Sequence, residues 1–307
     1  MKLLVGVFAY TLGCAILFGV LQWLFPSNEH QPTLPKRRGI KTDTWYWIVL
    51  PIIDRLVFKM IVIAAIVGFF MFMGWKPSAD QLNAGFGPVL RQPRWLQIIE
   101  AMIVADFAGY WIHRWFHTHK YWKYHAIHHS SPDLDWLGAT RLHPVNAGGN
   151  RIGQALSVAL LGFPPTVLAS WVIILTSWDL LIHANVNWTF GPFKYFFASP
   201  VFHRWHHTTA DEAQNKNFAG MFPFWDVIFG TFYMPEGRVP TVFGVSEPVP
   251  QDFMGQIVWP FTKEANIATG LEPDPSKVPA SDTPMTPAAA AVSVGAVATA
   301  LSSNPSP

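Results

Sequence analysis

Two neighbouring stretches of the chain, His113-Arg-Trp-Phe-His117 and His125-Ala-Ile-His128-His129, decide the fold, and a third, His203-Arg-Trp-His206-His207, repeats the second. Together the three clusters contain eight of the twelve histidines and border long apolar segments. On a helix, residues four apart project from one face, so His113 and His117 point the same way. Imidazoles gathered in this way predict a metal site at a membrane face.

The number of histidines predicts two ions. Within the second cluster, the i,i+3 and i,i+4 spacings place His128 and His129 within reach of the site that His125 faces. The third cluster repeats this spacing. Eight ring nitrogens are too many for one ion, and a structural zinc site takes four ligands, often with cysteine. The single cysteine, Cys14, excludes a cysteine-based metal site.

The composition predicts a membrane protein. Of the 307 residues, 50% are hydrophobic and only 13% are charged, whereas soluble domains carry about 25% charged residues. The 15 tryptophans suit a chain that lies at a lipid–water interface. The net charge of +2 predicts no nucleic-acid partner.

Apolar segments of about 20 residues predict three membrane spans, which are Leu3–Phe25, Tyr46–Trp75 and Leu96–Trp115. A later apolar segment contains Pro164-Pro165, which breaks a helix. A metal site cannot be assembled from both sides of a bilayer, so this segment must cross twice or not at all. We therefore expect a helical hairpin with arms near Ile152–Gly162 and Thr166–His183.

The predicted fold class is an all-α integral membrane protein, with about three spans, the broken hairpin, and a helical cap that carries the histidines. Basic residues gather in the loop after the first span and around the clusters, which places the cap on the cytoplasmic face (of the inner membrane, in a bacterium). The expected domains are residues 1–95 with the N-terminal spans, residues 96–262 with the metal site, and residues 263–307 as a disordered tail rich in Pro and Ala.

Four further residues are candidates for contact with the metal site. Asp106 lies two helical turns before His113, where it either packs between helices or accepts a hydrogen bond from a ligand imidazole. Asp135 and Asp226 are either such acceptors or members of helix caps and ion pairs. His143 is either a ligand, a partner of one, or a structural loop residue.

The clusters and their flanks resemble the fatty acid hydroxylase superfamily, also called the sterol desaturase family. Its HxxxH, HxxHH and HxxHH pattern is similar to the three clusters in their order. The flanks that agree are Trp111-Ile112-His113-Arg114, His128-His129-Ser130-Ser131, Asp135-Trp136, Arg141-Leu142-His143-Pro144, Asn217-Phe218 and Trp225-Asp226-Val227-Ile228-Phe229-Gly230-Thr231. The resemblance runs from about Asp106 to Phe232.

The resemblance implies a non-haem di-iron centre that activates O2 and hydroxylates a C–H bond of a lipid, with no catalytic residue beyond the metal ligands. It adds His183 as a ninth ligand, with Asn187 four residues later as a further candidate. Two alternatives remain. The same site would serve a lipid desaturase, and histidine-rich membrane proteins also transport metals.

The chain lacks a GxGxxG dinucleotide fingerprint. We therefore expect electrons from a separate ferredoxin, cytochrome or reductase. The lipid itself cannot be read from the sequence, because a sterol, a fatty acyl chain, a sphingoid base, an aminolipid and a carotenoid are all compatible with a pocket under the histidines.

Overall fold

The computed structural model describes residues 2–76 and 78–272, and these residues are helical apart from turns, loops and two isolated β-bridges. The α-helices are α1 (Lys2–Leu24), α2 (Ile40–Ile53), α3 (Lys59–Phe72), α4 (Ala79–Ala84), α5 (Arg94–Phe116), α6 (His119–His129), α7 (Pro144–Leu160), α8 (Pro165–His183), α9 (Pro200–His207), α10 (Phe224–Ile228), α11 (Phe253–Val258) and α12 (Lys263–Ala268). Short 3-10 or π turns are η1 (Asp54–Phe58), η2 (Pro88–Arg91), η3 (Trp136–Thr140), η4 (Gly191–Tyr195), η5 (Asp211–Ala213) and η6 (Trp259–Phe261).

Three helical segments are long and apolar enough to cross a membrane, so the chain is a multi-pass membrane protein by helix composition. They are Ile40–Phe72, Arg94–Phe116 and Pro165–His183. The first two agree with predicted spans, and the third is the second arm of the predicted hairpin. The first predicted span forms α1, whose apolar part among the searched residues, Ala9–Leu24, is shorter than a full span.

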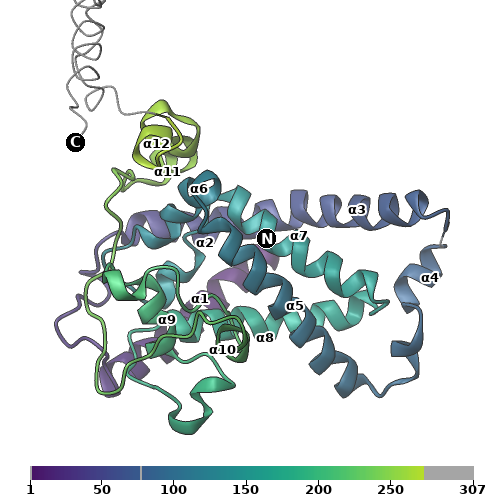
Figure 1. Cartoon of the computed structure of the whole chain (residues 1–307), viewed down its shortest axis with the longest axis horizontal. Helices are drawn as coiled ribbons and strands as arrows, with labels where there is room; N and C mark the ends of the chain where they lie inside the picture. The colour runs from purple at the N-terminus through teal and green to yellow at the C-terminus, as the bar shows by residue number, and fades with distance from the viewer. Residues whose placement is uncertain (1, 77, 273–307) are drawn as a thin grey trace, which may run out of the picture. The chain divides into compact units, whose positions relative to one another are not determined.

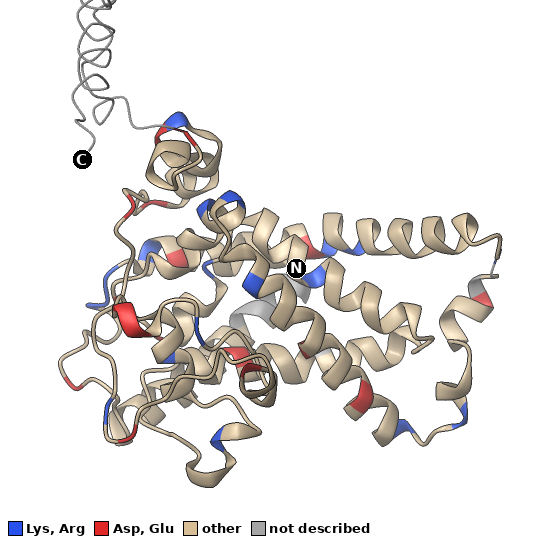
Figure 2. Cartoon of the chain, in the orientation of Figure 1, with Lys and Arg blue, Asp and Glu red and all other residues tan. Residues whose placement is uncertain are grey.

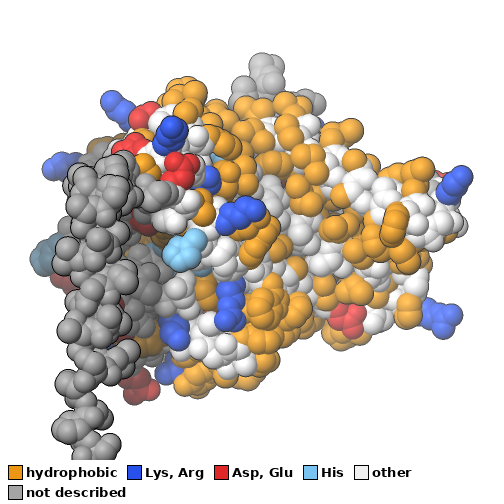
Figure 3. Space-filling view, turned by 45° about the horizontal axis from the view of Figure 1, so that its top comes forward, with side chains coloured by type: hydrophobic (Ala, Val, Ile, Leu, Met, Phe, Trp, Pro, Cys, Tyr) orange, Lys and Arg blue, Asp and Glu red, His pale blue; other side chains and the backbone are white. Residues whose placement is uncertain are grey.

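The first of these segments is continuous although it contains a proline. Pro51 lies inside α2 and has no N–H group to donate, and a single π turn, η1, follows it before α3 begins. Figure 2 shows no charged residue in α3 beyond its first turn, and none in the turn between α7 and α8. Figure 3 shows hydrophobic side chains covering much of the visible surface of the molecule, as contact with lipid requires.

The hairpin is confirmed and turns where the prolines predicted. α7 ends at Leu160, and α8 begins at Pro165 with Pro164 as its N-cap residue. The first arm begins earlier than predicted, because Pro144 occupies the first helical position, where its missing N–H group costs nothing. Both arms run beside α5, so the two ends of the hairpin lie on the same side (Figure 1).

Small residues let α5 and α7 approach closely. Ala101 and Ala105 of α5 are fully buried in a cluster with Val158 of α7. A side chain at Gly153 of α7 would collide with Ile112 of α5. Small residues at such contacts allow close helix packing in membranes, where hydrophobicity alone does not hold helices together.

A contact at Gly162 joins the helix ends away from the histidines. The Phe86 N–H group donates to the Gly162 carbonyl at 2.9 Å, which ties the segment before α5 to the α7–α8 turn. Gly162 has a φ of +89°, and a Cβ atom there would collide with the Phe86 carbonyl.

We expect Gly162→Ala to destabilise the protein by about 2 kcal/mol or more, from positive-φ strain together with this collision. Thermal unfolding in detergent measures the change. Gly237→Ala is the matched control, because Gly237 also has a positive φ but no atom near the added Cβ. Equal losses in the two variants would contradict the proposed contact.

The contacts divide the chain into a unit of residues 1–271 and a unit of residues 272–307. The tail was predicted to begin at residue 263, but its first residues form the helix α12. Ala265 of this helix is buried and packs in a cluster with Trp259. The remainder of that tail, residues 273–307, lies outside the described residues. The division into N-terminal spans and a metal-site domain at residue 95 stays a prediction.

Candidate metal centre

Four helices bring nine histidines together. His113 and His117 come from the end of α5, the second cluster from α6, His183 from the end of α8 and the third cluster from α9. Helix α9 begins as its sequence predicts, because the Ser199 hydroxyl accepts from the Phe202 N–H group and Pro200 takes the first position. All eight residues of α9 are buried.

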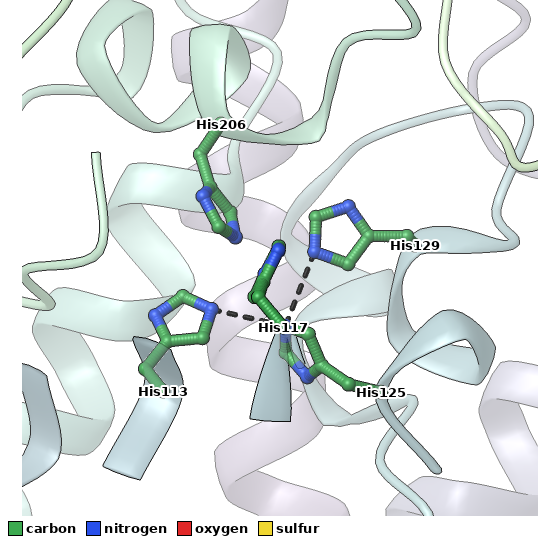
Figure 4. A group of neighbouring side chains, drawn as sticks. All are labelled: His113, His117, His125, His129 and His206. Carbon is green, nitrogen blue, oxygen red and sulfur yellow. Dashed lines mark hydrogen bonds between the residues drawn. The ribbon is translucent and has the colours of Figure 1, made fainter. Parts of the chain in front are cut away.

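The nine histidines form two groups, in each of which the candidate ligand atoms lie within 4.8 Å of one another. The five-histidine group, drawn in Figure 4, consists of His113, His117, His125, His129 and His206. The four-histidine group consists of His128, His183, His203 and His207. Every predicted ligand therefore belongs to one of two groups, and none of the nine lies apart.

Each HxxHH cluster contributes to both groups. His125 and His129 belong to the five-histidine group, but His128 belongs to the other. In α9 the assignment is reversed, since His206 alone joins the five-histidine group. The expectation that His128 shares the site of His125 is therefore wrong. Helical geometry explains this, because residues i+3 and i+4 are about 100° apart around the axis.

Backbone carbonyl groups fix the orientation of four of the nine rings. The Nδ1 atom of His113 donates to the Phe218 carbonyl at 2.8 Å, and that of His128 donates to the Arg141 carbonyl at 3.2 Å. In the same way, His183 donates to the Asp179 carbonyl at 2.7 Å, and His206 donates to the Lys216 carbonyl at 2.8 Å. A carbonyl oxygen only accepts, so Nδ1 carries the proton in each ring. A neutral ring then presents its Nε2 atom as a free lone pair.

The Nε2 atoms face one another at short distances. Those of His113 and His125 are 2.9 Å apart, and those of His128 and His183 are 3.1 Å apart. In the second pair both nitrogens carry lone pairs, so no proton lies between them and they repel each other. Two nitrogens bound to one ion at about 2.1 Å and at a right angle would be about 3 Å apart. This donor set therefore fits metal ions.

Buried ring nitrogens without a hydrogen-bond partner also indicate a metal site. Within the described part of the chain, the Nε2 atoms of His117 and His206 are buried and have no hydrogen-bond partner. Leaving a buried polar atom unpaired costs about 1–3 kcal/mol. A bound cation would satisfy both atoms at once, so the buried clusters are consistent with a metal site.

The electrostatic environment keeps the ligands neutral. Burial lowers the pKa of His125, His129 and His207 well below the usual value, and neighbouring imidazoles lower it further. Neutral imidazole is the form that binds metal.

We expect the metal-free protein to lose stability as the pH falls below about 6.5, the usual pKa of histidine in an unfolded chain. The unfolded chain takes up protons there, whereas the buried imidazoles do not until their lower folded-state pKa values are reached. The free energy of unfolding, measured by denaturant titration after chelation, should therefore be lower at about pH 5.5 than at about pH 7.5. Equal values would contradict buried neutral histidines.

Two of the predicted carboxylates bind a loop that contacts a histidine, and not the histidines themselves. Asp226 accepts from the N–H groups of Phe218 and Ala219, and Asp106 accepts from those of Met221 and Phe222. Both carboxylates are buried. They fix the loop whose Phe218 carbonyl accepts from His113, and burial raises the pKa of Asp226 to about 6.

The other three candidates have partners outside the two groups. Asp135 caps η3 and pairs with Arg37 at 2.6 Å. His143 is buried, accepts from the Val145 N–H group and donates to the Ile257 carbonyl; burial lowers its pKa to about 4. Asn187 is exposed, and its backbone N–H group donates to Phe25.

Three supporting residues were not among the predicted ones. The Asn146 side chain lies 3.0 Å from His125 Nδ1. Arg141 offers its carbonyl to His128 while its guanidinium pairs with the buried Asp43 at 2.5 Å. Asp179 holds His183 through its carbonyl. The only signal in the sequence was position, since Asn146 and Arg141 flank His143 and Asp179 lies one turn before His183.

A cavity of about 1020 Å³ leads to the histidines between α3, α5, α7 and α8. His113, His125, His128, His183 and His203 line it at one end. Apolar side chains such as Val62, Phe70, Phe163, Leu168 and Trp171 line much of the remainder. A cavity of this size and lining suits an extended apolar ligand.

Residues 98–231 match the model of the fatty acid hydroxylase family. Among curated proteins, the chain is 31% identical over 174 residues to the ornithine lipid hydroxylase OlsE of Rhizobium tropici, which covers 56% of this chain and 52% of that protein. It is 33% identical over 150 residues to human alkylglycerol monooxygenase, covering 48% and 33% respectively. It is 28% identical over 149 residues to methylsterol monooxygenase 1-1 of Arabidopsis thaliana, covering 44% and 46%.

The chain thus spans about half or less of the length of these relatives. No solved structure matches it. The matched segment contains all three histidine clusters, His183 and the loop held by Asp226. The similarity to the fatty acid hydroxylase family thus covers residues 98–231, somewhat less than half of the chain.

Proposed function

We propose that this protein is a membrane-bound di-iron oxygenase that hydroxylates a C–H bond of a lipid. One observation carries the proposal: two buried groups of imidazoles, with Nε2 atoms facing one another, lie at the end of an apolar cavity. Imidazole suits iron, and the family match favours iron over zinc or copper.

The nine histidines of the two groups would hold the two ions. Two iron ions bound there would activate O2, so that one oxygen atom enters the C–H bond and the other leaves as water, with two electrons and two protons from outside. A separate ferredoxin, cytochrome or reductase would supply these electrons.

The chain's own residues orient and protect the reaction site. Backbone acceptors such as the Phe218 and Arg141 carbonyls hold the ligand rings in one tautomer, as partners of metal-bound histidine do. The apolar cavity would align the hydrocarbon of the substrate with the histidine end. Its lining also keeps bulk water away from the oxidising centre.

Hydroxylation is favoured over desaturation at the same site. The names of the three relatives describe hydroxylases or monooxygenases of lipids. The metal-transporter alternative requires polar ligands along a path through the spans. Here all nine histidines gather in two groups at one end of the helices, which suits a fixed centre better.

We place the histidine end on the cytoplasmic side, from the basic residues around it. Lys120 and Lys123 lie on α6 beside the second cluster, and Lys36 and Arg38 precede α2. Basic residues near the ends of spans favour the cytoplasmic side.

Lipid extracts from cells with and without the protein test the proposal. We expect a species heavier by one oxygen atom, and that atom should carry the label when cells grow under ¹⁸O2. A species lighter by two hydrogen atoms would indicate a desaturase instead. No change in any lipid, with iron present in the purified protein, would contradict lipid oxidation.

A further inference from the structure

The cavity is not apolar throughout. Its lining includes the charged residues Asp54, Arg55, Lys59, Asp106, Arg151 and Asp179. We call three of them, Asp54, Arg151 and Asp179, the charged collar. Arg151 Nε lies 3.2 Å from Asp54 Oδ1, and these side chains are 37% and 38% exposed. The Asp179 side chain is 46% exposed and lines the cavity.

The collar lies at the histidine end of the cavity on three separate helices. On α8, Asp179 is one turn from His183, whereas the apolar lining residues Trp171 and Leu168 lie farther along the helix. At 1.5 Å per residue, Asp179 is about 6 Å from His183 along the axis and Leu168 about 22 Å. On the α2–α3 segment, Asp54 likewise precedes the apolar lining that extends to Phe70.

Asp179 forms no ion pair with a lysine or arginine among the described residues, although Arg151 of the collar lies near enough to interact with its charge. Its Oδ1 atom lies 3.4 Å from His183 Nδ1, but that nitrogen donates to the Asp179 carbonyl at 2.7 Å. A carboxylate that faces a cavity without an ion-pair partner is costly, so a cationic ligand group would stabilise it.

We propose that the charged collar binds the head group of a zwitterionic lipid, with the lipid ammonium on Asp179 and its anionic group on Arg151. This inference rests on the proposed function and names its substrate class. The hydrocarbon then extends toward Phe163 and Trp171 at the far end of the cavity. Because Asp179 adjoins His183, oxidation falls on a carbon near the polar end of the lipid. A sterol, with one hydroxyl group and no charge, would leave the Asp179 carboxylate without a cationic partner.

A matched pair of lipids tests the proposal by binding alone. Oleoyl lysophosphatidylethanolamine carries an ammonium and a phosphate, and its N-acetyl derivative keeps only the phosphate. In native mass spectrometry of the full-length protein in detergent, we expect the ammonium lipid to bind about tenfold more tightly, as for one hydrogen-bonded charge pair. Equal binding to the wild-type protein would overturn the proposal.

Variants assign the two ends of the head group. Asp179→Asn should abolish the preference for the ammonium lipid, and Asp179→Glu should retain it. Arg151→Gln should weaken both lipids about equally, since they share the phosphate. Asp80→Asn is the matched control, because Asp80 is exposed on α4 and does not line the cavity. A preference that persists in Asp179→Asn would overturn the assignment, and the wild-type comparison stands even if this variant fails to fold.

The iron content and lipid oxidation of each protein are measured separately. A protein that contains iron and oxidises lipid but does not distinguish the pair would contradict the collar and leave the proposed function standing. A protein that distinguishes the pair but contains no iron would contradict the proposed function instead.

Discussion

Replacing His203 by alanine should remove about one of two bound metal ions and lower lipid oxidation about a thousandfold or more. His203 belongs to the four-histidine group, where each ring is one of only four candidate ligands. Its Nε2 atom lies 3.0 Å from those of both His183 and His207, so its loss opens the centre of the group. Elemental analysis and the ¹⁸O2 assay measure the two effects.

His119→Ala is the matched control for this variant. His119 lies beside the second cluster in the sequence but is exposed at the start of α6 and belongs to neither group. It should keep full metal content and activity. If His203→Ala also kept both, the four-histidine group would not be a metal site.

Asp43→Ala should lower the free energy of unfolding by about 3–5 kcal/mol, because it removes one partner of a buried ion-pair network. The Asp43 side chain is fully buried and pairs with both Arg37 and Arg141. Since the Arg141 carbonyl accepts from His128, the variant should also lower the metal content. Denaturant unfolding in detergent and elemental analysis measure these changes.

Glu236→Ala is the control for the ion-pair network. Its side chain is 92% exposed and lies 3.5 Å from Lys194, and surface pairs of this kind contribute little. Stability should therefore be unchanged. An Asp43→Ala protein as stable as Glu236→Ala would show that the buried network does not support the metal centre.

Much of the architecture follows from local patterns that the sequence displays. Apolar length gave two of the spans, and Pro164-Pro165 gave the turn of the hairpin, because proline restricts the residue before it and breaks a helix. The second and third histidine clusters were expected on the same side of the membrane, because a metal site cannot be assembled from both sides of a bilayer. Helical spacing alone, however, did not predict that His128 joins the group of His203 and His207 while His206 joins the group of His125 and His129. This arrangement depends on how α6 and α9 face each other.

The supporting contacts were harder to predict because they join distant parts of the chain. Asp43 and Arg141 are almost 100 residues apart, and a pattern in one segment contains no information about its partner in another. Asp106 and Asp226 were recognised as candidates, but their partners are backbone N–H groups of a loop rather than imidazoles. Asp179 is a single acid in an apolar helix, and only its position one turn before His183 links it to the site.

The central claim is that the two histidine groups hold two iron ions. Elemental analysis of the purified full-length protein, with Mössbauer spectroscopy of ⁵⁷Fe-enriched samples, tests it most directly. We expect about two iron ions per chain with the spectrum of a coupled pair. About one zinc ion per chain and no iron would contradict the account.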